Sequence, residues 1–124
     1  MTFTEEALER YRLHAEICKV LTDPKRLMLL DALRHGDRTV QELADTIGVA
    51  LPNASQHLAV LRSAGLVEGH RIGTTVRYRL AEPGIIAACD AVHGIVERRQ
   101  ARKLPESNVA VTGAIPQSTW RSPG

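Results

Sequence analysis

Aromatic and cysteine residues are scarce in this sequence. Aromatic side chains make up 3% of the 124 residues, so the hydrophobic core has to be aliphatic. Cys18 and Cys89 are too few for a secreted disulfide scaffold, and no Cys-x-x-Cys pair suggests a zinc finger. No apolar run reaches the roughly 18 residues of a membrane-spanning helix, and the acidic start MTFTEEALERYR is unlike an export signal. We therefore expect a cytoplasmic protein with reduced thiols and no membrane partner.

The motifs of common enzymes are also missing. Gly65, Gly69 and Gly73 are spaced four apart, which is not the pattern of a phosphate-binding loop, and the sequence contains no nucleophile elbow. Ser55 and His57 are two positions apart on an expected helix. Their side chains then point roughly 200° apart and cannot act as a nucleophile and its base. The sequence predicts a protein that is not an enzyme and requires no cofactor.

The overall charge is mildly positive. The formal net charge is +2 and the isoelectric point is about 8.8, so a nucleic-acid surface would need local clustering of cations. A content of 44% hydrophobic and 24% charged residues suits one soluble domain, which we place at residues 1–103. Residues 104–124 are rich in Pro, Ser, Thr and Gly and have no sustained period. We expect them to form a flexible tail, in which Trp120 has no evident partner.

Four helices are expected in the first 65 residues, because apolar positions recur at helical spacing between residues typical of helix ends. Asp23 and Pro24 suit the cap and first position of the second helix, and Thr39 with Glu42 matches a capping box. The fourth helix starts without a side-chain acceptor, at Val49-Ala50-Leu51-Pro52. The first helix is predicted to start at Thr2 or Thr4. The next three are predicted to run from Asp23 to Gly36, from Thr39 to Gly48 and from Pro52 to Gly65.

After Gly65 the apolar period changes from helical to two. The segments LVEGHRI and TVRYRLA flank Gly73-Thr74, which predicts a β-hairpin. Its second strand has an apolar face and a basic face, formed respectively by Val76, Tyr78 and Leu80 and by Arg77 and Arg79. Residues 83–103 then return to a helical period.

The first and last expected helices both carry apolar stripes. The stripe of the first helix is Leu8, Tyr11, Ala15 and Cys18, and that of the last is Ile85, Cys89, Val92 and Val96. These stripes are more apolar surface than a small core can cover. Packing within one chain or pairing between two chains would bury them.

The outer face of the helix within residues 52–67 carries polar and basic side chains but no carboxylate before Glu68. Leu51 to Leu80 contains four arginines and one glutamate, a local net charge of +3. A helix in the major groove of DNA needs donors and acceptors that address base edges, whereas carboxylates are repelled by phosphates. Two short helices followed by a basic hairpin are the order of a winged helix-turn-helix. There the second helix enters the major groove and the hairpin reaches the adjacent backbone or minor groove.

The predicted fold is therefore mostly α-helical with a small β-hairpin, a winged helix-turn-helix, and its predicted partner is double-stranded DNA. The alternative is a small helical domain whose hairpin binds a protein. The candidate DNA contacts lie on the third helix, the fourth helix and the hairpin, and they are Thr39, Gln41, Asn53, Ser55, Gln56, His57, Arg62, Arg71, Thr74, Thr75 and Arg77.

Four segments of the chain, DPKRLMLLDAL, ELADTIGV, SQHLAVLRSAGLV and RIGTTVRYRL, closely resemble the ArsR/SmtB family of bacterial transcriptional repressors. The resemblance runs in order through most of the expected domain, and the segment from Ser55 to Val67 is its most specific part. It implies a homodimer that pairs through the first and last helices, represses an operator, and leaves the DNA when an inducer binds. The terminal apolar stripes agree with such a dimer.

The metal ligands of many relatives are absent. Those relatives carry a Cys-x-Cys after the Glu-Leu of the third helix, where this chain has Glu42-Leu43-Ala44-Asp45-Thr46. Other relatives bind metals on the last helix, where this chain offers Asp90, His93 and Glu97 but no second histidine. A two-fold axis could supply a second set of ligands. These three residues are therefore kept as an alternative metal site, beside an interpretation in which His93 is solvated or lies in an interface.

Cys18 and Cys89 are the candidate sensor thiols. They lie on the two stripes that the resemblance assigns to the dimer interface, and several relatives sense oxidants, persulfides or metalloids with cysteines on these or adjacent helices. Only Cys89 falls near a matching position, because the second helix has Leu30-Asp31-Ala32 where the best-known persulfide arrangement has a cysteine. Two alternatives stay open, a metal- or metalloid-responsive repressor and a constitutive repressor in which both cysteines are buried apolar residues.

Overall fold

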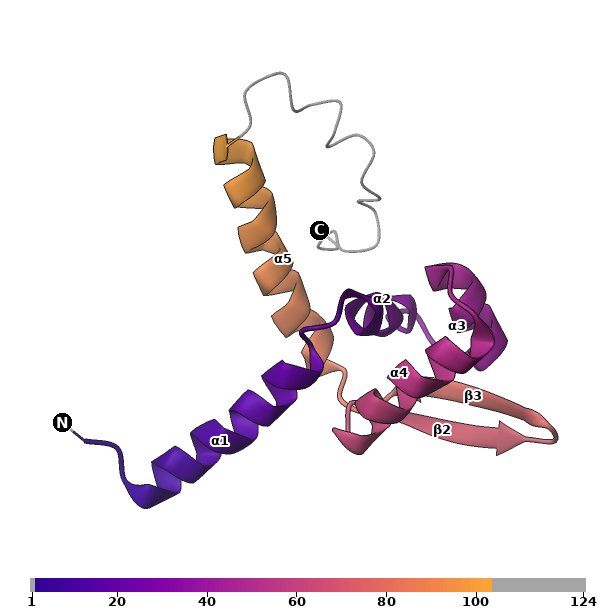
Figure 1. Cartoon of the computed structure of the whole chain (residues 1–124), viewed down its shortest axis with the longest axis horizontal. Helices are drawn as coiled ribbons and strands as arrows, with labels where there is room; N and C mark the ends of the chain where they lie inside the picture. The colour runs from indigo at the N-terminus through magenta and orange to yellow at the C-terminus, as the bar shows by residue number, and fades with distance from the viewer. Residues whose placement is uncertain (1, 104–124) are drawn as a thin grey trace. The chain divides into compact units, whose positions relative to one another are not determined.

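The computed structural model describes residues 2–103 of the chain (Figure 1). The chain divides into two compact units, residues 1–82 and the part from Pro83 onward, and each is described by itself. The tail expected at residues 104–124, with Trp120, lies outside the described residues.

The first unit contains four helices, and their caps explain their limits. They are α1 (Glu5–Val20), α2 (Pro24–Ala32), α3 (Val40–Ile47) and α4 (Leu51–Ser63). The side chains of Thr4 and Asp23 accept hydrogen bonds from the backbone of the first turns of α1 and α2. The capping box of Thr39 and Glu42 is confirmed at the start of α3. Ala50 gives α4 no side-chain cap, as expected.

Helix α2 ends earlier than the sequence predicts. The expected end was Gly36, but the helix stops at Ala32 with Leu33 as its cap. Beyond it the N–H groups of Arg34 and Gly36 donate to the carbonyls of Asp31 and Leu33, three residues back. These tighter turns satisfy the last carbonyls of the helix, and the chain reverses at Gly36, whose φ is 141°.

A three-stranded antiparallel sheet accompanies the helices, in the order β1-β3-β2. The hairpin strands β2 (Val67–Ile72) and β3 (Thr75–Leu80) are joined by Gly73-Thr74, where the sequence placed the turn (Figure 1). Strand β1 (Arg38–Thr39) was not expected, because a two-residue strand carries no readable alternation. It pairs with β3 directly before α3 begins and ties that helix to the hairpin.

The core of the first unit is aliphatic, as the composition predicts. Its largest fully buried side chains are Leu29, Leu30, Leu33, Leu43, Leu58, Leu61 and Val67. They come from α2 and its cap Leu33, from α3 and α4, and from the start of β2. Among the described residues Tyr78 is the one buried aromatic side chain, on the apolar face of β3. This core holds α4 by its inner face and leaves the other face to solvent.

The second unit contains α5 (Gly84–Lys103), the predicted last helix. None of the helices within residues 2–103 is both long enough and apolar enough to cross a bilayer.

Candidate nucleic-acid interface

Helix α4 presents a polar, carboxylate-free outer face. Its buried residues Ala54, Leu58 and Leu61 are spaced by four and three and fasten the inner side to the core. Facing solvent are Asn53, Ser55, Gln56 and Arg62. The first three offer neutral donors and acceptors, and Arg62 adds a cation near the end of the helix. A surface of this kind can address base edges and phosphates without placing a negative charge near the DNA.

His57, one of the expected DNA contacts, lies at the edge of this outer face rather than on it. Position 57 lies directly beside the buried stripe, between Ala54 and Leu61, so the side chain is half-buried. Its Nδ1 atom lies 3.4 Å from Nη1 of Arg26 in the first turn of α2. The ring therefore connects two helices, and a DNA contact by His57 stays a prediction.

The expected contacts at the start of α3 are partly engaged within the protein. Oγ1 of Thr39 accepts from the backbone N–H of Glu42 at 3.0 Å, and Oε1 of Glu42 accepts from the N–H of Thr39 at 2.9 Å. This backbone hydrogen bond is the main reason that the pKa of Glu42 lies below its ordinary value. Gln41 is exposed, with its amide donating to Asp45 at 2.9 Å. The side chains of Thr39 and Gln41 remain at the surface, at the N-terminus of a two-turn helix.

The tip of the hairpin is exposed and has no acidic residue. Arg71, Thr74 and Thr75 all face solvent there. Ile72, which no sequence pattern indicated, is 64% exposed beside them. The nearest carboxylate is that of Glu68, lower in β2. Its Oε1 accepts from both Nε and Nη2 of Arg79, each at 2.7 Å. The ion pair lowers the pKa of Glu68 and neutralises the charge of Arg79 locally.

Arg77 has a structural contact that the sequence did not indicate. Its Nη2 donates to the carbonyl oxygen of Asp37 at 3.2 Å, across 40 positions of sequence. Arg77 also lies opposite Thr39 in the β1–β3 ladder and is half-buried. Its guanidinium thus holds the segment that leads into α3 against the hairpin.

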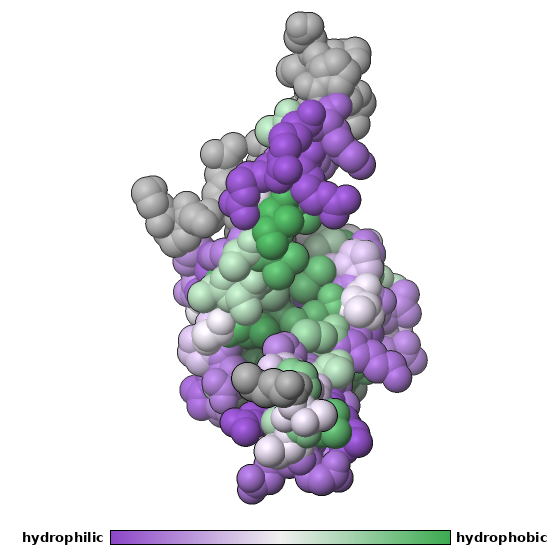
Figure 2. Space-filling view, turned by 90° about the vertical axis from the view of Figure 1, so that its left-hand side faces the viewer, coloured by the Kyte–Doolittle hydropathy of each residue, from purple (hydrophilic) through white to green (hydrophobic). Residues whose placement is uncertain are grey.

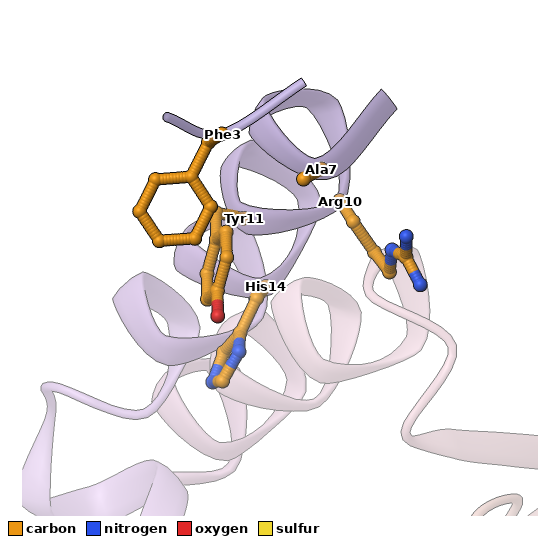
Figure 3. A pocket seen from close by; sticks show the side chains of 5 residues that line it. All are labelled: Phe3, Ala7, Arg10, Tyr11 and His14. Carbon is orange, nitrogen blue, oxygen red and sulfur yellow. The ribbon is translucent and has the colours of Figure 1, made fainter. Parts of the chain in front are cut away.

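Helix α1 exposes an apolar face with a hollow in it. None of its residues is buried. Figure 3 shows the hollow over Ala7, with the rings of Phe3 and Tyr11 on one side and the side chain of Arg10 on the other. The two rings meet edge to face with their centroids 5.3 Å apart. Ala7, Arg10, Tyr11 and His14 have the spacing i, i+3, i+4, i+7 of a hole that receives a side chain from a facing helix.

Helix α5 exposes apolar and basic side chains in succession. Val92, Ile95 and Val96 lie on one stripe and are 61%, 48% and 42% exposed. They are followed by the exposed cations Arg98, Arg99, Arg102 and Lys103. Figure 2 shows hydrophilic side chains gathered in the upper part of the view, above green apolar side chains. The helix therefore offers solvent an apolar stripe of a kind that usually marks an interface.

The candidate sensor residues are divided between the two units. Cys18 on α1 is exposed and Cys89 on α5 is buried, and both are thiols. Asp90, His93 and Glu97 also lie on α5. Within residues 2–103 no three His, Cys, Asp or Glu side chains are grouped as a metal ion would require. Asp90, His93 and Glu97 of a single chain are therefore not grouped as a metal site.

The sequence of this chain is similar to that of known bacterial repressors. Residues 23–69 match the family described as bacterial regulatory protein, arsR family. The HTH-type transcriptional repressor SmtB of Mycobacterium tuberculosis is 43% identical over 67 residues, which are 54% of this chain and 50% of that protein. The biofilm growth-associated repressor of Xylella fastidiosa is 40% identical over 81 residues, which are 65% of this chain and 71% of that protein. The chain thus spans about half the length of the SmtB relative and more of the second.

The fold is shared with solved structures. A homodimeric winged helix-turn-helix DNA-binding domain from Mycobacterium bovis, a possible ArsR-family regulator, is similar to this chain with a TM-score of 0.71 and 30% sequence identity. The similarity covers 81% of this chain and 93% of that one. The winged helix-turn-helix predicted from the sequence is thereby confirmed, with α3 and α4 as the helix pair and β2–β3 as the wing. By its sequence and its fold, the chain belongs to the ArsR family of bacterial regulatory proteins.

Proposed function

We propose that this protein is a homodimeric DNA-binding repressor in the cytoplasm, with α4 in the major groove of its operator. The observation that carries the proposal is the exposed face of α4, which combines neutral hydrogen-bonding side chains with an arginine and has no carboxylate. The wing supports it, because its exposed tip is basic and its one carboxylate is paired with Arg79. The repressor names of the two relatives described above agree with this function.

The proposed dimer pairs through α1 and α5. Both helices expose apolar side chains, and the hollow over Ala7 has the spacing of a hole for a helix of a second copy. A dimer also suits the task, since a single short helix and wing would contact too few base pairs for useful specificity. The related domain from Mycobacterium bovis is itself homodimeric.

Release from DNA is proposed to depend on Cys18 and Cys89. A two-electron oxidant such as hydrogen peroxide would take two electrons from the two thiols, whose protons leave with the water formed. The resulting disulfide requires the two Cα atoms to approach to roughly 5.5–6 Å, within one chain or across the dimer. A persulfide signal would act on the same thiols. There are two alternatives. The inducer could be a metal held by Asp90, His93 and Glu97 from two protomers, or repression could be constitutive.

Selection of bound sequences from random double-stranded DNA tests the repressor function. We expect enrichment of a two-fold symmetric site bound by a dimer. Gln56→Ala should then relax the preference at one position of each half-site by roughly 1–3 kcal/mol, while Ser63→Ala, at the exposed end of the same helix, should leave it unchanged. Equal affinity for every sequence would refute the proposal that the protein binds an operator. Equal base preferences for Gln56→Ala and Ser63→Ala would exclude Gln56 from base recognition.

A further inference from the structure

One guanidinium group, that of Arg26, joins three elements of the first unit. Its Nε donates to the carbonyl oxygen of Val20, the last residue of α1, at 2.6 Å. Its Nη1 lies 3.4 Å from Nδ1 of His57 on α4 and 4.0 Å from Oδ2 of Asp23, the cap of α2. The side chain is only 17% exposed. Arg26 thus contacts the end of α1 and the recognition helix at the same time.

These contacts leave the group little freedom. The carbonyl of Val20 is in the last turn of α1 and has no partner within that helix, so the Arg26 N–H supplies one. Asp23 is itself held, because its Oδ1 accepts from the N–H of Lys25 at 2.7 Å. The guanidinium is planar, with donors in fixed directions, so one orientation serves both Val20 and His57. A lysine ammonium, a point charge on a flexible stem, would not hold the two partners at a set angle.

The contact with His57 assigns a role to one ring nitrogen. Arg26 can only donate, so in this contact Nδ1 of His57 is the acceptor. The imidazole therefore takes part in the link as an acceptor held at the edge of the buried stripe of α4. A side chain without an acceptor at this position would leave one N–H of Arg26 without its partner.

We propose that Arg26 is a positioning residue that sets the angle between α1 and α4 and thereby the half-site spacing that the dimer accepts. The inference rests on the proposed function, in which α1 belongs to the dimer interface and α4 reads DNA. In such a dimer a change of angle between these helices changes the separation of the two recognition helices. Successive base pairs are about 3.4 Å apart, so a shift of a few ångströms corresponds to one base pair of spacing.

Operators with spacers one base pair shorter or longer than the selected site test this role. The parent protein should strongly prefer the selected spacing. Arg26→Lys keeps the charge but loses the planar guanidinium with its fixed donor directions. We expect the preference for the selected spacing to fall about tenfold, which is the effect of one lost base-pair contact. Lys25→Gln, which removes a neighbouring cation outside the link, should keep the parent preference.

Variants of His57 make the test independent of the folding of the Arg26 variant. His57→Gln retains an acceptor and should keep the spacing preference, whereas His57→Leu removes it and should lose the preference. If His57 only contacted DNA, His57→Leu would weaken binding equally at all spacings. The proposal is overturned if Arg26→Lys or His57→Leu keeps the spacing preference of the parent protein. Failure of the parent to bind any specific site would instead refute the proposed function.

Discussion

Gly69 lies directly opposite Tyr78 in the β2–β3 ladder, and a Cβ atom at position 69 would be 3.2 Å from Cε1 of the tyrosine ring. The ring is nearly buried and is the aromatic part of an otherwise aliphatic core. The hairpin therefore packs its backbone against this ring at the one position where β2 has no side chain. This close approach links the wing to the core beneath it.

Gly69→Ala should therefore destabilise the protein. The added methyl group would displace the ring or the strand, and overpacking of this kind costs about 1–3 kcal/mol. Urea unfolding monitored by circular dichroism would measure the loss. Gly84→Ala is the control, since a Cβ at position 84 meets nothing within 4 Å. Equal midpoints for the two variants would contradict the packing constraint at Gly69.

Two arginines of the hairpin should differ in what they do. Arg71→Ala, at the exposed tip, should weaken binding to all DNA sequences and reduce the slope of log affinity against log salt by about one. The free energy of unfolding should not change. Arg77→Ala should lower that free energy by about 1 kcal/mol, because the hydrogen bond to the Asp37 carbonyl is lost. Salt titrations of DNA binding and urea unfolding of both variants would show whether the two roles are separate.

A charge on the apolar stripe of α5 should dissociate the proposed dimer. In Val92→Glu an unpaired carboxylate would be buried twice at a two-fold interface. Sedimentation should then show monomers, and operator affinity should fall steeply because the half-sites are no longer held together. Ala101→Glu places the same charge at an exposed position on the opposite side of α5 and should remain dimeric. A dimeric Val92→Glu protein would place the interface elsewhere.

The two thiols should differ in reactivity before any cross-link forms. In the single chain Cys18 is exposed and Cys89 is buried, so in a monomeric variant such as Val92→Glu a small alkylating reagent should modify Cys18 first. Under peroxide, mass spectrometry should detect a Cys18–Cys89 disulfide, within or between protomers, together with loss of operator binding. Cys18→Ser and Cys89→Ser should each stay on the operator under the same treatment. Release of both serine variants would reject the thiol switch and favour a ligand that is not thiol-reactive.

Most helix ends and the hairpin turn were predictable because their causes are local. The capping box joins Thr39 to a residue three positions later, and Asp23 caps α2 through an N–H two positions away. Gly73 adopts a φ of 64° at the turn, a conformation that glycine takes without strain. The apolar periods also identified α4 and its outer face, since Ala54, Leu58 and Leu61 face the core. All these signals lie within one or two turns of chain.

The tertiary structure alone decided the contacts between distant segments. His57 is 31 positions from Arg26, and Arg77 is 40 positions from Asp37. Contacts over such separations produce no periodic pattern in the sequence, because each contact depends on how the helices and strands pack around the aliphatic core. The short strand β1 exists for the same reason, since two residues become a strand only when β3 lies beside them. The sequence by itself thus determined which elements form and which face of α4 is polar. Packing turned His57 away from that face and gave Arg26 and Arg77 their partners, because only the folded chain brings those atoms within reach of one another.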